Sequence, residues 1–102
     1  MANTKVEIRV DTTASKEVYV CGSTKALGAW DPKHAVKLEQ ISATTFSVSK
    51  LMATGEVVEF KVLSGKSWDN VEKGSYGEEI QNHLLTPSKG LVEVVVVSKF
   101  NK

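Results

Sequence analysis

The sequence has no long apolar run and no excess of charge of one sign. Its longest apolar stretch, from Leu91 to Val97, is interrupted by Glu93 and falls well short of the roughly 20 residues that span a bilayer. Lys and Arg number 13 against 12 Asp and Glu, and no basic run compensates locally for the net charge of +1. Proteins that bind nucleic acids depend on a strong positive field. We therefore expect neither a membrane nor a nucleic-acid partner.

Cysteine is almost absent. A single residue, Cys21, cannot form an internal disulfide, so the fold must be stable without one. No His or Asn is close to it in sequence, which favours a half-buried structural thiol over a nucleophile. The first residues also lack the apolar segment of a secretory signal. This leaves open a cytoplasmic protein or a module excised from a secreted or larger chain.

The residues that catalysis or metal binding requires are scarce. A metal site needs at least about three good ligands, and the sequence has two His and one Cys in all. No nucleophile motif, zinc-protease motif or phosphate-binding glycine loop occurs. The acidic pairs Glu78-Glu79 and Asp69/Glu72 could act as acid and base, but such carboxylates are more commonly solvated loop residues. We expect a protein that is not an enzyme and that uses no cofactor or metal.

Apolar residues recur with a period of two along most of the chain, which is typical of strands with one buried face. In the clearest case, Val6, Ile8 and Val10 alternate with Glu7 and Arg9. The same pattern predicts strands at 6–10, 18–21, 36–38, 46–48 and 58–62, a short one at Ile80, and a last one at 91–98 that is buried on both faces for part of its length.

Turn residues separate these predicted strands, and helical periodicity never persists. Only residues 23–27 could form one helical turn before Gly28 ends it. No linker, repeat or low-complexity stretch divides the chain, so residues 1–102 form one domain. The fold class is all-β, a single antiparallel β-sandwich of about seven strands. Nothing in the sequence demands a dimer, and we expect a monomer.

The few aromatic residues are unusually placed. Trp30 precedes Asp31-Pro32 and Trp68 precedes Asp69-Asn70, so both indoles occur in turns, which usually lie at the surface. Phe residues in the predicted strands can fill the core without them. Exposed flat rings suit a ligand with an apolar face and a hydroxylated rim, such as a sugar. The alternative for Trp30 is that its ring anchors the turn into the core.

A specific combination of motifs runs through the chain. The run Leu27-Gly28-Ala29-Trp30-Asp31-Pro32 follows a strand with a Gly22-Ser23 turn and precedes Ala35-Val36-Lys37-Leu38. Residues 58–62 look like an aromatic-Lys strand, and residues 68–82 look like a Trp-containing loop that ends in Asn. Together these residues resemble the starch-binding domains of carbohydrate-binding module family 20. The resemblance extends over residues 6–97.

That resemblance implies an immunoglobulin-like, open-sided sandwich or distorted barrel. It also implies non-catalytic binding of α-1,4-linked glucans: starch, glycogen and maltooligosaccharides. In the site that the family shares, two Trp rings stack on successive glucoses, and a Lys and an Asn hydrogen-bond the hydroxyls. By motif position, Trp30 corresponds to the first ring and Lys61 to the Lys.

The sequence departs from the family at the second ring. The family usually places that Trp directly after a Val-Glu-like pair, whereas here Val71-Glu72 is followed by Lys73. Trp68 is the nearest indole and could present its ring to the same site. The resemblance thus adds Trp68, Glu72 and Asn82 to the expected carbohydrate-binding residues. It leaves open a weakened site, or one retuned for glycogen or another α-glucan.

The sequence is compatible with functions of three different classes. The leading hypothesis is a module that binds α-glucan polysaccharides or oligosaccharides by stacking sugar rings on surface Trp side chains. The alternative is a protein-interaction domain that has kept the β-sandwich but lost glucan binding, which the missing Trp at Lys73 would favour. A small hydrolase is disfavoured by the absence of a nucleophile or metal set.

Overall fold

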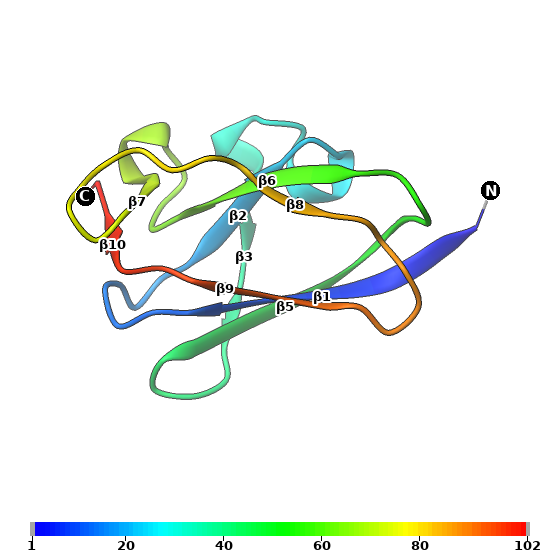
Figure 1. Ribbon diagram of the computed structural model, residues 1–102, viewed down its shortest axis with the longest axis horizontal. Helices are drawn as coiled ribbons and strands as arrows, with labels where there is room; N and C mark the ends of the chain where they lie inside the picture. Colours follow the sequence, from blue (N-terminus) through cyan, green and yellow to red (C-terminus); the bar gives the residue numbers. More distant parts are fainter. Residues whose placement is uncertain (1, 102) are drawn as a thin grey trace.

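The computed structural model describes residues 2–101 and shows two four-stranded sheets packed face to face (Figure 1). The first sheet, in the lower half of the view, has the order β4 (Glu39–Gln40), β5 (Thr45–Ala53), β1 (Asn3–Asp11), β9 (Val92–Val96). The second sheet has the order β3 (Val36–Lys37), β2 (Tyr19–Gly22), β6 (Val58–Leu63), β8 (His83–Leu85). A separate ribbon pairs β7 (Glu72–Lys73) with β10 (Lys99–Phe100). The predicted β-sandwich is confirmed.

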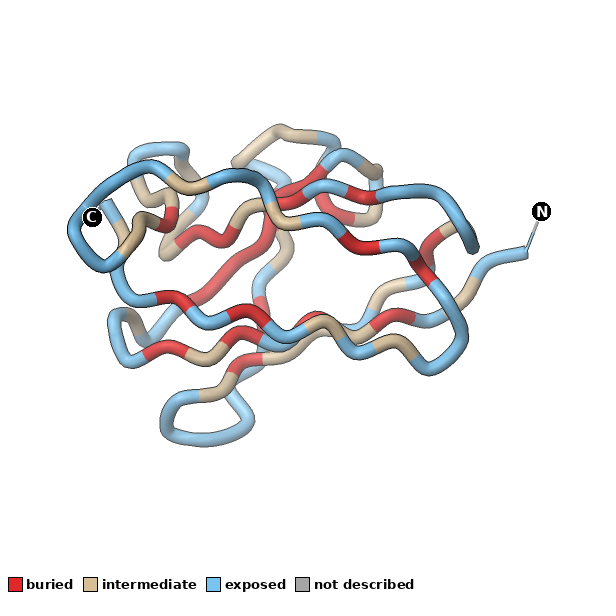
Figure 2. The backbone as a smooth tube through the Cα atoms, viewed as in Figure 1, coloured by how far each residue is buried: buried red, intermediate tan, exposed pale blue. Residues whose placement is uncertain are grey.

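The core lies between the two sheets and follows the period of two in the sequence. Val6, Ile8 and Val10 of β1 are buried and pack in one cluster with the inward residues of β6, which include Phe60. In Figure 2 the buried segments alternate with exposed ones along both layers. The register between β1 and β5 places Val10 opposite Phe46. A one-residue slip would turn these side chains to solvent, so the core fixes the register.

The strand predicted at Ile80 is absent, and the strand β8 begins three positions later, at His83. Residues 74–82 form a loop with its own turns: the amide of Gly74 donates to the carbonyl of Glu78, and that of Gly77 donates to the carbonyl of Gly74. These bonds use backbone groups that a strand would need for pairing. The single apolar residue at 80 was therefore a poor strand signal.

Strand β9 is buried on one face only, contrary to the prediction for residues 91–98. Val95 and Val97 point into the core, whereas Val94 is 54% and Val96 is 73% exposed. The strand lies at an edge of the first sheet, and no described element covers its outer face. Its valines reflect β-propensity rather than burial. The β9 strand also runs parallel to β1, so the first sheet is mixed, whereas we expected antiparallel pairing throughout.

Three short 3₁₀ helices lie in the described loops: η1 (Lys25–Leu27), η2 (Pro32–His34) and η3 (Trp68–Asn70). The first confirms the helical turn predicted before Gly28, which takes the left-handed conformation at φ 87°. Within residues 2–101 no helix has the length and apolar character needed to cross a bilayer. Cys21, on β2, is fully buried rather than half-buried, and burial raises the pKa of its thiol.

Candidate functional site

A surface hollow of about 450 Å³ lies beside β6, η3 and the loop 74–82. All five residues expected from the sequence line it. The complete lining is Trp30, Lys61, Trp68, Val71, Glu72, Lys73, Glu79, Ile80 and Asn82. The hollow thus combines aromatic faces with a few charged and amide groups, a composition typical of ligand sites. The described residues contain no cluster of His, Cys, Asp or Glu that could hold a metal ion.

Trp30 reaches the hollow from a strained turn between η1 and η2. Ala29 and Trp30 both have positive φ, 49° and 64°, a conformation that non-glycine residues adopt rarely. The turn is held by backbone hydrogen bonds of 2.8 Å, from Trp30 N to the Gly22 carbonyl and from Ala29 N to the Thr24 carbonyl. Trp30 is half-buried and lies outside the core clusters of the described chain. Strain that neighbouring structure maintains in this way is typical of functional sites.

Trp68 opens η3 and lies beside the first indole. The Ser67 hydroxyl accepts a hydrogen bond from the backbone N of Asp69 at 3.2 Å and so caps this short helix. Trp68 is 40% exposed. Its ring centroid lies 6.1 Å from that of Trp30, and the two ring planes are inclined by 40°. The two indoles therefore form a tilted aromatic pair at the surface.

Two lysines connect the hollow to the loop 74–82. Lys61 of β6 donates a hydrogen bond from Nζ to the carbonyl of Ile80. Lys73 of β7 forms an ion pair with Glu79, with 3.2 Å between Nζ and Oε1. Both contacts tie the loop to the strands beneath it. The loop contributes Glu79, Ile80 and Asn82 to the hollow, so these tethers shape its wall.

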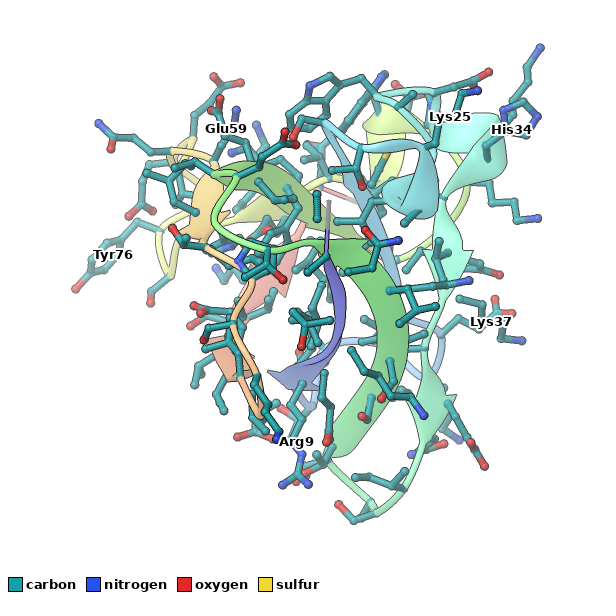
Figure 3. All side chains as sticks on the ribbon, turned by 90° about the vertical axis from the view of Figure 1, so that its right-hand side faces the viewer. Arg9, Lys25, His34, Lys37, Glu59 and Tyr76 are labelled. Carbon is teal, nitrogen blue, oxygen red and sulfur yellow. The ribbon has the colours of Figure 1, made fainter. Side chains whose placement is uncertain are left out.

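Asn82 is an exposed residue at the end of this loop. Its Nδ2 donates to Oε1 of Glu59 at 3.3 Å, and among residues 2–101 no hydrogen bond to its side-chain carbonyl oxygen is seen. Figure 3 shows Glu59 and Tyr76 on one side of the molecule, opposite Lys25 and His34 of the helical turns. Tyr76 projects outward and is 93% exposed.

Glu72 lines the hollow but does not offer its carboxylate to solvent. Only 1% of the residue is exposed, and its oxygens contact the backbone N of Val62 and the ring of His83. The resemblance had placed Glu72 among the expected carbohydrate-binding residues. The structure buries its carboxylate in the wall of the hollow.

Four lining residues were missed by sequence reasoning: Val71, Lys73, Glu79 and Ile80. The signal for Lys73 was present, because it occupies the position where the resemblance would place the second Trp. Glu79 and Ile80 carried no usable signal, since their position depends on how the loop 74–82 folds back over β6.

Comparison with known proteins identifies the family of the chain. The family model described as the starch binding domain matches residues 2–95. An α-amylase of Niallia circulans is 34% identical over 92 residues, which are 90% of this chain and 7% of that protein. The chain thus spans a small fraction of this curated relative.

Solved structures share the fold. The family 20 module of a maltotetraose-forming amylase from Pseudomonas saccharophila has a TM-score of 0.66 at 24% identity, covering 94% of this chain and 98% of that one. A family 15 glucoamylase from Hypocrea jecorina has a TM-score of 0.72 at 22% identity, covering 100% of this chain and 18% of that one. The chain belongs to the starch-binding domains of carbohydrate-binding module family 20, which are non-catalytic binding modules.

Proposed function

We propose that this domain binds α-1,4-linked glucans by stacking successive sugar rings on Trp30 and Trp68. The observation that carries the proposal is the pair of indoles, 6.1 Å apart and inclined by 40°, in the lining of a hollow that also contains charged and amide side chains. The apolar face of a glucose unit packs on an indole as other apolar groups do. Two inclined rings match a chain that curves from one sugar to the next, which favours a helical α-glucan over a flat β-linked one.

Polar side chains around the rings would bond the sugar hydroxyls. The ammonium of Lys61 can donate to a hydroxyl while it keeps its bond to Ile80, because it carries three protons. Asn82 can accept a hydrogen bond through its side-chain carbonyl oxygen. The backbone bonds that hold Trp30 and the cap that holds Trp68 are already formed without ligand, so little ordering is needed on binding.

Trp68 would replace the second ring that the family places at the position of Lys73. The indole arrives from η3 rather than from β7, and the Lys73–Glu79 ion pair occupies the adjacent wall. The number of stacking rings is therefore kept although their origin in the sequence differs. We expect a functional site with altered ring spacing rather than a lost one.

The direct test is a titration with β-cyclodextrin, a closed α-1,4 glucan, followed by intrinsic Trp fluorescence, with a soluble β-glucan as control. We expect a saturable change with the cyclodextrin only, because both indoles of the protein lie at the hollow. No change in fluorescence and no heat in calorimetry on a folded sample would refute glucan binding. That result would make the protein-interaction domain the leading function.

Lys61→Ala should weaken β-cyclodextrin binding about fivefold, or about 1 kcal/mol, as expected for one charge-assisted hydrogen bond at a wet surface. Calorimetry provides the measurement. Lys5→Ala is the control, because Lys5 is an exposed residue of β1 that does not line the hollow. Equal affinities for the Lys61→Ala variant and the wild type would remove Lys61 from the site.

A further inference from the structure

The carboxylate of Glu72 is buried and forms a small hydrogen-bonded cluster next to the hollow. Its Oε2 accepts a hydrogen bond from the backbone N of Val62 at 2.5 Å. The Nε2 atom of His83 lies 2.7 Å from Oε1 and 2.9 Å from Oε2. One ring nitrogen therefore lies within hydrogen-bond distance of both carboxylate oxygens. A buried carboxylate is costly unless its oxygens are bonded, and here both oxygens are.

The Glu72 carboxylate takes the place of a backbone acceptor where the pairing of β6 with β8 ends. The ladder between β6 and β8 ends at the pair Phe60 and His83, where the loop 74–82 leaves the sheet. The next inward residue of β6, Val62, would have no partner from β8 for its amide. The side chain of Glu72 takes that amide and at the same time holds His83. The ring of His83 also packs on Phe60, with 5.2 Å between the ring centroids.

The residues that meet at the carboxylate come from β6, β7 and β8. Each of them directly adjoins, in the sequence, a residue that lines the hollow. The adjoining pairs are Lys61 and Val62, Glu72 and Lys73, and Asn82 and His83. One buried side chain therefore links the three strands that carry or directly adjoin Lys61, Lys73 and Asn82.

We propose that Glu72 and His83 are positioning residues of the glucan site. Their contact fixes the spacing of β6, β7 and β8 and thereby aims Lys61, Lys73 and Asn82 at the bound sugar. The inference rests on the proposed function, because it concerns the geometry of that same site. It assigns a role to His83, which does not line the hollow, and it assigns to Glu72 an indirect role in place of contact with sugar.

The test compares Glu72→Ala with Glu72→Gln in β-cyclodextrin calorimetry, at temperatures where each variant is fully folded. Glu72→Ala should lose about tenfold in affinity, because the three surface groups must then be ordered on binding. Glu72→Gln keeps the side-chain volume and an acceptor for Val62, so its affinity should stay within about threefold of the wild type. Val6→Ala is the control: it removes buried volume from β1, in the opposite sheet, and should leave the affinity unchanged.

Amide NMR spectra without ligand give a second readout, which does not depend on glucan binding. The amide signals of Lys61, Lys73 and Asn82 should shift or broaden in Glu72→Ala and stay in place in Val6→Ala. If Glu72→Ala does not fold, His83→Gln replaces it, with the same expected result. An affinity within twofold of the wild type together with unmoved signals in the folded variant overturns the proposal, as does an equal loss in Val6→Ala. If the wild type itself does not bind, the proposed function fails, and the spectra still decide whether the pair positions these residues.

Discussion

Replacing Trp30 with Ala should reduce the affinity for β-cyclodextrin by about a hundredfold or more, equivalent to about 3 kcal/mol, while the domain stays folded. Trp30 is half-buried beside Trp68 and does not belong to the core clusters of the described residues. Its loss therefore removes a stacking surface without opening a cavity between the sheets. Calorimetry gives the affinity, and thermal unfolding gives the stability.

Two further substitutions at this position separate the contribution of the indole ring to affinity from the effect of the backbone conformation on stability. Trp30→Phe retains a smaller flat ring and should recover part of the affinity. Trp30→Gly should be more stable than Trp30→Ala by about 1 kcal/mol, because glycine tolerates the positive φ of 64°. If Trp30→Ala instead unfolds the domain, the indole is a structural anchor, and the ring assignment at the site is wrong.

Gly28→Ala should cost about 3 kcal/mol of folding free energy and weaken glucan binding as well. Gly28 has a φ of 87°, and a Cβ atom there would lie 2.6 Å from the carbonyl oxygen of His34. Backbone cannot move aside as a flexible side chain can, so the turn between η1 and η2 must shift. That turn carries Trp30 into the hollow. Denaturant unfolding measures the stability. Titration with cyclodextrin measures the affinity, which should fall if the shifted turn displaces the ring of Trp30.

Gly55→Ala is the matched control for this substitution. Gly55 has a nearly equal φ of 85°, but a Cβ atom there would have nothing within 4 Å. The control therefore carries only the conformational penalty, about 1–2 kcal/mol, and should bind glucan normally. Equal losses of stability in the two variants would mean that the close approach to His34 is relieved without cost.

The fold followed from the sequence wherever burial alternates. The residues Val6, Ile8 and Val10 predicted both the strand and its inward face, because one side of β1 packs in the core and the other faces water. The prediction for 91–98 was wrong on burial because a valine run has the same appearance at a sheet edge and in a sheet interior. Its parallel pairing with β1 has no local signature, since the pairing joins segments far apart in the chain.

At the site, the turn residues beside Trp30 and Trp68 and the family motif predicted that both indoles lie in surface turns. The structure brings the two side chains to one hollow. That they bind sugar stays a prediction. The inward direction of Glu72 could not be inferred from Val71-Glu72-Lys73, because it depends on the amide of Val62 and on His83, which belong to other strands. The conformation of residues 74–82 could not be predicted from the sequence either, because contacts with Lys61 and Lys73 of the strands shape that loop.

The parallel pairing of β1 with β9 also has a kinetic consequence. Strand β1 lies between β5 and β9, and Glu7 is opposite Val92, so the first sheet is complete only after segments from both ends of the domain meet. The entropy of closing such a long loop precedes any gain from the contacts it makes. Until β9 arrives, one side of β1 presents unpaired amides and carbonyls, and this interval is when the chain is most open to pairing with another molecule.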